Sequence, residues 1–174
     1  MWMWEGDPVA EATFQALGIK PVPLSMVDVL TSLQTGLING AYASPLAAIA
    51  LQWNTRVKYM MGVPLADASG AVVVSRTMYD KLPKDLQEIL IRNGRKYMRD
   101  LTLKSRKENA DAITALKKSG MQVVDVSSPS VIAEYVAAGK RARQSLVGKL
   151  YDQPFLDRVE KALADFRAKE KSSK

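Results

Sequence analysis

The sequence predicts an α/β fold with a mainly parallel sheet flanked by helices. Along the first 53 residues, short extended segments alternate with helical ones, in the order strand, helix, strand, helix, strand, helix. Turn and capping residues separate them, and 47% hydrophobic with 25% charged residues is typical of a globular domain. Such alternation favours parallel strands, because each crossover helix packs on a face of the sheet.

The first strand and helix are indicated by the opening fourteen residues, MWMWEGDPVAEATF. Trp2 and Trp4 are two apart, so a strand places both side chains on one face. Asp7 suits the N-cap and Pro8 the first helical position. The spacing predicts a helix from Pro8 to about Leu17, stopped by Gly18.

Residues 21–24 (PVPL) predict the second strand, and a helix should follow from Ser25 or Met26 to Asn39-Gly40. Its apolar stripe at helical spacing comprises Val29, Leu30, Leu33 and Leu37. Residues 41–44 (AYAS) predict a third strand, and Pro45 begins a helix through Trp53, whose ring belongs in the core.

The pattern changes at residues 57–75, an extended segment interrupted by Gly62 and Pro64. Two strands joined by a bend, or one ribbon between two bodies, both fit its length. After a helical turn at residues 76–82, a helix should run from Pro83 to Gly120, about 55 Å at full length. A compact globule of this size is about 40 Å across, so one lobe cannot bury this helix. A coiled-coil arm is the alternative, although sustained heptads are missing.

The remaining segments predict a strand at residues 121–126 and two helices, at residues 129–150 and 153–171. The last residues should fray.

Composition excludes many kinds of site. The sequence has no cysteine and no histidine, which removes disulfides, thiol nucleophiles, the usual zinc sites and imidazole acid–base chemistry. No phosphate-binding glycine loop occurs. Carboxylate-only chemistry or an oxygen-ligated Mg²⁺ or Ca²⁺ site stays open, although no acidic cluster has the spacing of a calcium-binding loop. Our expectation is no catalytic residues, no metal and no cofactor.

The net charge of +7 indicates a solvated surface rather than a nucleic-acid interface. Basic residues alternate with acidic ones along the helices, as in RKYMRDLTLKSRKENAD. The longest apolar stretches are far shorter than a membrane span, so the chain should not be embedded in a membrane.

Several motifs, taken in order, resemble those of the substrate-binding proteins of tripartite ATP-independent periplasmic (TRAP) transporters, of the DctP type. They are Ala16-Leu17-Gly18, the PVPL strand, LQTGLING at residues 33–40, and Pro45 at the start of a helix. SRTMYDKLPKDLQEIL resembles the family's approach to a long helix, and KKSGMQVVDV its return strand.

The resemblance implies a periplasmic-binding-protein-like fold of two α/β lobes that close over a ligand. Residues 1–60 would form the second lobe, residues 61–82 crossing strands toward the first lobe, residues 83–119 the long connecting helix, and residues 120–174 a strand and helices packing on the lobes. Because family members are roughly twice as long, the chain resembles their C-terminal part, an incomplete two-lobed fold.

The function implied by the resemblance is capture of a small organic ligand for the membrane subunits of a TRAP transporter. The protein would be periplasmic and not an enzyme. Two copies of so incomplete a fold are expected to pair through exposed strand edges.

The expected ligand site departs from the family pattern. Family members commonly bind a substrate carboxylate with an arginine where Trp2 aligns, and carry Glu-Asn where this chain has Tyr42-Ala43. We therefore expect a more aromatic cleft lined by Trp2, Trp4, Tyr42, Ala43 and Ser44, with Glu5 available to a ligand hydroxyl or amine. Burial of these aromatics in the core, and Glu5 as a helix-start acid, are equally consistent with the sequence.

Two other functions stay open. A small-molecule enzyme could use carboxylate pairs drawn from Glu5, Asp7, Asp28 and Asp67. A basic interaction module would bind nucleic acid with strong salt dependence.

Overall fold

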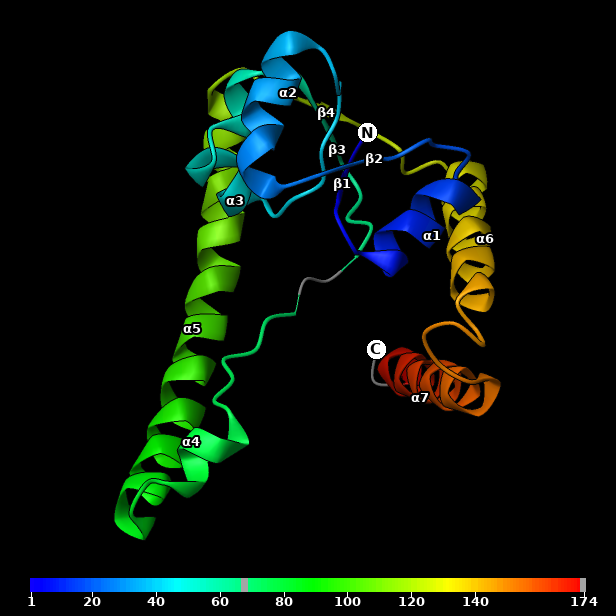
Figure 1. Cartoon of the computed structure of the whole chain (residues 1–174). Helices are drawn as coiled ribbons and strands as arrows, with labels where there is room; N and C mark the ends of the chain where they lie inside the picture. The colour runs from blue at the N-terminus through cyan, green and yellow to red at the C-terminus, as the bar shows by residue number, and fades with distance from the viewer. Residues whose placement is uncertain (67–68, 173–174) are drawn as a thin grey trace. The chain divides into compact units, whose positions relative to one another are not determined.

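Contacts divide the chain into two units in the computed structural model (Figure 1). The first unit comprises residues 1–42 and 126–174, and the second comprises residues 43–125. The structure describes residues 1–66 and 69–172, without the side chains of residues 171 and 172. This grouping reflects which residues pack together and does not test the four-part division into lobes, which stays a prediction.

The first unit begins with two parallel strands, β1 (Trp2–Trp4) and β2 (Val22–Leu24), in the register Trp2 opposite Val22. Between them, α1 (Pro8–Ala16) begins as predicted: the Asp7 side chain accepts hydrogen bonds from the amides of Val9 and Ala10. These bonds satisfy two of the amides that a helix N-terminus leaves without a partner.

The helix after β2 ends earlier than predicted. A short 3₁₀ turn, η1 (Met26–Asp28), leads into α2 (Val29–Thr35), which stops at Gly36 rather than at Asn39-Gly40. Gly36 has φ of 78°, a left-handed conformation that glycine adopts without the Cβ clash. Val29 and Ile38 are 0% and 3% exposed and belong to the core of this unit.

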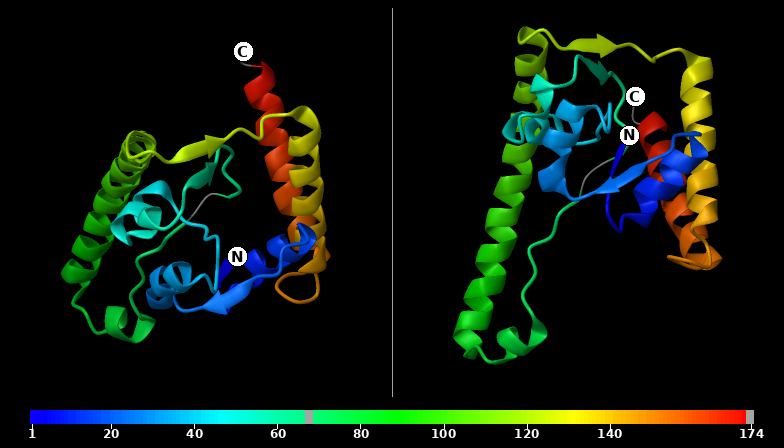
Figure 2. Two further views of the ribbon diagram at one scale, coloured as in Figure 1. Left: turned by 90° about the horizontal axis from the view of Figure 1, so that it is seen from above. Right: turned by 45° about the horizontal axis from the view of Figure 1, so that its top comes forward.

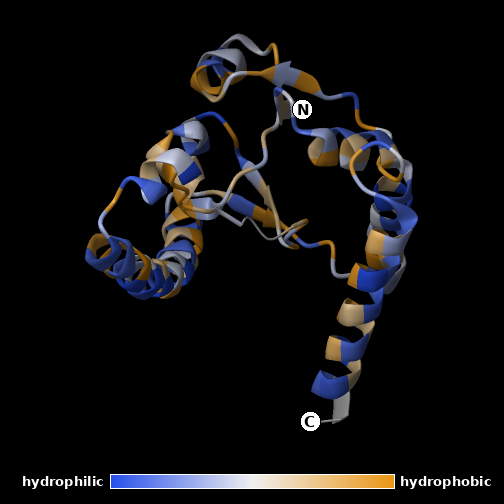
Figure 3. Ribbon diagram, turned by 60° about the horizontal axis from the view of Figure 1, so that its bottom comes forward, coloured by the Kyte–Doolittle hydropathy of each residue, from blue (hydrophilic) through white to orange (hydrophobic). Residues whose placement is uncertain are grey.

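The C-terminal helices complete the first unit. The helix α6 (Pro129–Ser145) lies beside α1, as the two views of Figure 2 agree. Their contact is made by three buried side chains, Ala12, Ala142 and Leu146. Along α7 (Gln153–Ser172) polar and apolar residues alternate (Figure 3), and its Glu160 pairs with Arg143 of α6 at 3.1 Å.

The second unit contains another parallel pair, β3 (Tyr59–Met61) and β4 (Gln122–Val124). The predicted long helix is present as α5 (Lys84–Lys118), 35 residues or about 52 Å long. The helix α3 (Pro45–Ala50) packs against the C-terminal half of α5, and the short turn η2 (Trp53–Thr55) packs against α3. Trp53 is 4% exposed, which confirms its predicted place in the core.

The N-terminal end of α5 is joined to α4 (Arg76–Asp80) by a tight turn. Gln87 is 7% exposed, and its side-chain amide donates to the carbonyls of Tyr79 and Leu82 at 3.2 and 2.9 Å. These bonds tie the end of α4 and the following turn to the first turn of α5.

The strand expected at residues 41–44 is wrong, and the extended segment at residues 57–75 contains less strand than two strands with a bend would need. Residues 41–44 contain no strand: the amide of Trp2 donates to the Gly40 carbonyl at 2.7 Å, but the amide of Trp4 meets the Tyr42 hydroxyl at 3.4 Å instead of a backbone carbonyl. A backbone ladder therefore does not continue along this segment. In the 57–75 stretch only Tyr59–Met61 is a strand among the described residues, and Val72–Val74 are 52–85% exposed.

No helix within residues 1–66 and 69–172 is both long enough and apolar enough to cross a membrane.

Candidate functional site

The strand β1 places Trp2 and Trp4 in different surroundings. Trp2 is 3% exposed, and its indole N–H donates to the Leu24 carbonyl of β2 at 2.9 Å. Trp4 is 49% exposed, with its ring centroid 6.4 Å from that of Trp2. Trp4 therefore presents free ring surface, whereas Trp2 supports the rings around it.

Tyr42 joins the two tryptophans although it is 38 residues away from Trp4. Its ring stacks on Trp2, with centroids 5.0 Å apart and planes at 25°, while Phe14 of α1 meets it edge-on at 5.6 Å. Such geometries are the preferred ones for aromatic pairs. We call Trp2, Trp4, Phe14 and Tyr42 the aromatic cluster. Three of its members were predicted from the sequence as ligand contacts. Phe14 was not, because the sequence of its helix does not indicate a contact with Tyr42, 28 residues away.

Asp7 connects the aromatic cluster to α1. One carboxylate oxygen caps the helix, accepting from Val9 and Ala10 at 3.1 and 3.0 Å, and the other accepts the Tyr42 hydroxyl proton at 3.0 Å. Burial raises the pKa of Tyr42 above its usual range; the Trp4 amide opposes this, and the bond to Asp7 and its charge raise the pKa further.

The other three residues expected to contact ligand, Glu5, Ala43 and Ser44, have no ring to add to the aromatic cluster. Glu5 is exposed in the turn after β1. Ala43 and Ser44 belong to the second unit, where the Ser44 hydroxyl caps α3 by accepting from the Ala47 amide at 3.2 Å. Whether all six residues contact a ligand stays a prediction.

The carboxylates considered for an enzyme do not form a described pair. Asp7 serves the helix cap and Tyr42, Asp28 is exposed in η1, and Asp67 lies outside the described residues. No three acidic side chains of residues 1–66 and 69–172 gather into a group that could hold a metal ion.

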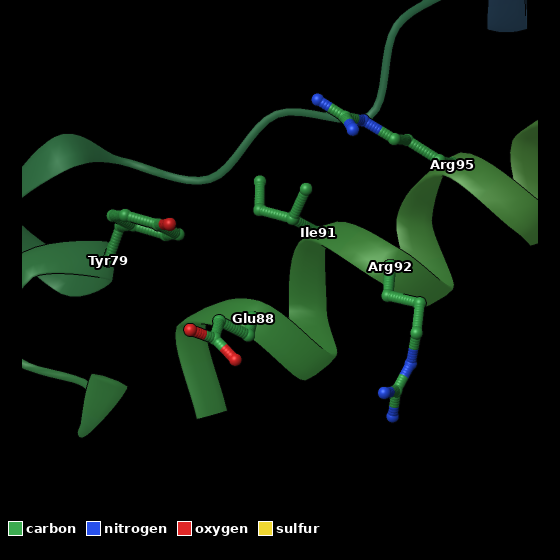
Figure 4. Close-up of a pocket in the computed structure, with 5 residues that line it drawn as sticks. All are labelled: Tyr79, Glu88, Ile91, Arg92 and Arg95. Atoms are coloured by element: carbon green, nitrogen blue, oxygen red, sulfur yellow. The ribbon is translucent and has the colours of Figure 1, made fainter. Parts of the chain in front are cut away.

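The second unit carries an open pocket of about 500 Å³ between α4 and the first half of α5. Figure 4 shows Tyr79 of α4 facing the side of α5 from which Ile91 projects; the other lining residues are Glu88, Arg92 and Arg95. Sequence reasoning missed this pocket, because it depends on how α4 turns back along α5.

The solved structures that this chain resembles share its fold, and they are TRAP periplasmic solute-binding proteins. One from Citrobacter koseri with bound D-glucuronate has a TM-score of 0.73 and 24% identity, over 94% of this chain and 51% of its own. One from Desulfovibrio salexigens with bound orotic acid has a TM-score of 0.70 and 18% identity, over 83% and 46%. The predicted fold class, an incomplete two-lobed binding-protein fold, is confirmed.

The family follows from a sequence model described as bacterial extracellular solute-binding protein, family 7 (DctP), which matches residues 5–147. The chain belongs to this family, as its motifs predicted. A curated relative, the C4-dicarboxylate-binding periplasmic protein DctP of Rhodobacter capsulatus, is 26% identical over 119 residues, which are 67% of this chain and 35% of that protein. The chain spans about a third of the length of the curated relatives it matches.

Family membership bears on two further predictions. The family consists of extracellular solute-binding proteins rather than enzymes. Its solved members resembling this chain are periplasmic, in agreement with the predicted location.

Proposed function

We propose that this chain belongs to a binding protein that captures a small organic acid with a planar or apolar body and delivers it to the membrane subunits of a TRAP transporter. The observation that carries the proposal is the aromatic cluster, in which Tyr42 is stacked on the buried Trp2 and the Trp4 ring is half exposed. A half-exposed indole on a fixed base offers apolar contact area with little loss of side-chain freedom on binding.

The sequence of β1 supports a ligand different from a small dicarboxylate. Two carboxylates are normally held by guanidinium groups in bidentate geometry, and residues 1–17 contain no arginine or lysine. They contain three acids, Glu5, Asp7 and Glu11. A ring or sugar body on Trp4 and Tyr42, with Glu5 accepting from a ligand hydroxyl or amine, fits this composition better.

Calorimetric titration of the chain tests the proposal with three probes: orotate, D-glucuronate and succinate. We expect orotate to bind most tightly, because its planar ring can stack. Trp4→Ala should weaken orotate binding roughly tenfold, the effect expected of removing an aromatic contact. Tyr97→Ala, at a 58% exposed tyrosine of α5, serves as the control and should change nothing. Equal affinity for succinate, untouched by Trp4→Ala, would refute an aromatic platform.

A second part of the proposal is that the chain works within a larger binding protein. Support comes from exposed apolar side chains of the second unit, which are 40–85% exposed: Val72, Val73, Leu86, Leu90 and Leu101. The spacing of Leu86, Leu90 and Leu101 places them on one face of α5, and an exposed apolar stripe of this kind is typical of an interaction face. The chain alone should therefore self-associate and bind a hydrophobic dye; a monomer in light scattering with a sharp cooperative melt and no dye binding would count against this part.

A further inference from the structure

We propose that Asp7 is a positioning residue that fixes the Tyr42 side chain on Trp2. The inference rests on the proposed function, in which Tyr42 forms part of the ligand platform. Asp7 is suited to this task because its two carboxylate oxygens have different partners: one is held by the α1 amides and the other faces the Tyr42 hydroxyl.

The ring and the hydroxyl of Tyr42, which is partly exposed, both have partners. The ring stacks on Trp2 and meets Phe14 in a T-shaped arrangement, and the hydroxyl donates to Asp7 while accepting, over a longer 3.4 Å, from the Trp4 amide. A phenol has one proton to donate. A ligand on Tyr42 therefore meets the ring and one acceptor lone pair, and finds no donor for a carboxylate.

The position of Asp7 makes this contact rigid. The carboxylate cannot turn toward solvent without breaking the cap of α1, and α1 is itself packed on α6 through Ala12. Tyr42 is also the last residue of its segment in the first unit, since residue 43 belongs to the second. The Asp7–Tyr42 bond thus holds the end of residues 1–42, the N-terminal segment of the first unit.

Two substitutions remove the bond from opposite sides. Asp7→Ser keeps a good N-cap residue but leaves no second oxygen for Tyr42. Tyr42→Phe keeps the stacked ring and removes the hydroxyl. Asp28→Ser and Tyr97→Phe are matched controls, because Asp28 provides no side-chain cap and Tyr97 is exposed.

The first measurement is a double-mutant cycle on the equilibrium constant of unfolding, using the complete chain. If Asp7 and Tyr42 act through one bond, each single variant raises the constant roughly tenfold, and the double variant is little worse than either. The control pair should be additive and close to neutral. Additive effects of Asp7→Ser and Tyr42→Phe would overturn the proposal.

The second measurement follows Tyr42 itself, by a pH titration of ring-labelled tyrosine in nuclear magnetic resonance, with the Tyr42 signal assigned through Tyr42→Phe. Asp7→Ser should lower the pKa of Tyr42, because the carboxylate opposes the phenolate. Asp28→Ser should leave it unchanged. A purely structural role of Asp7 in capping α1 would leave the Tyr42 pKa unmoved in Asp7→Ser, which would also overturn the proposal.

Orotate titration of the same variants separates this inference from the proposed function. One outcome supports both the positioning role and the proposed function: the double-mutant cycle shows coupling between Asp7 and Tyr42, and each single variant binds orotate about fivefold more weakly. If the cycle shows coupling but neither variant changes the affinity for orotate, D-glucuronate or succinate, the positioning role is supported and the aromatic platform is refuted.

Discussion

The side-chain oxygen of Asn109, in the C-terminal half of α5, accepts the backbone N–H of Leu46 in the first turn of α3 at 3.1 Å. The Asn109 amide group donates at 2.8 Å to the Ser105 carbonyl one turn earlier, which fixes the orientation of the side chain. Together with the Ser44 cap, Asn109 satisfies the start of a helix of only six residues. A helix this short depends on such tertiary contacts, because it is too short to be stable alone.

Replacing Asn109 tests this contact. Asn109→Ala should lower the free energy of unfolding by about 1–2 kcal/mol, because the Leu46 amide loses its partner. Asn109→Asp keeps the acceptor and should lose less. Chemical denaturation of both variants measures which of them loses more free energy of unfolding. Equal losses in Asn109→Ala and Asn109→Asp would mean that the bond to Leu46 contributes nothing.

The buried indole of Trp2 should matter through its N–H. Trp2→Phe keeps an aromatic ring but leaves the Leu24 carbonyl without its donor, so we expect a loss of about 1–3 kcal/mol in the free energy of unfolding. Trp4→Phe is the same change at a half-exposed position and should cost less than about 1 kcal/mol. Thermal melts of Trp2→Phe and Trp4→Phe compare the two losses of stability directly. Similar losses would contradict the difference in burial between Trp2 and Trp4.

Two glycines predict opposite outcomes for the same substitution. Gly36→Ala should destabilise by about 1–2 kcal/mol, because Gly36 has a left-handed φ of 78°. Gly94→Ala, within α5, should stabilise by about 0.5–1 kcal/mol. An added Cβ meets no atom within 4 Å at either position, so backbone conformation alone decides the sign. Denaturant titrations measure both; a stabilising Gly36→Ala would disprove the left-handed cap.

Stability should fall at alkaline pH through Tyr42. Its pKa is raised in the folded protein, so above the ordinary tyrosine value near 10 the unfolded chain loses the proton first. The unfolded state then binds fewer protons, and the free energy of unfolding declines as pH rises from there through the raised pKa. Tyr42→Phe should flatten this decline while Tyr97→Phe retains it, as melts between pH 8 and 11 would record.

Local chemistry explains what was predicted well. The Asp7 cap and Pro8 set the start of α1, and Pro83 and Gly120 bracket α5, because capping and helix breaking act within a turn of the residue concerned. The alternation of short strands and helices likewise indicated parallel pairs, and both described pairs are parallel.

The predictions that were wrong have two different causes. The end predicted for α2, Asn39-Gly40, is wrong because Gly36 adopts a left-handed conformation and stops the helix earlier. Residues 41–44 looked extended, yet the Tyr42 hydroxyl, rather than a backbone carbonyl, lies against the Trp4 amide.

For the candidate site, the sequence by itself determined which side chains are available: two tryptophans on one strand, a tyrosine near a turn, no histidine, no cysteine and no arginine in the first 17 residues. Only the tertiary structure decided that Trp2 is buried while Trp4 is half exposed, that Phe14 joins them, and that Asp7 binds Tyr42. The physical reason is that capping and chain direction depend on neighbouring residues, whereas burial and ring stacking depend on contacts between segments tens of residues apart.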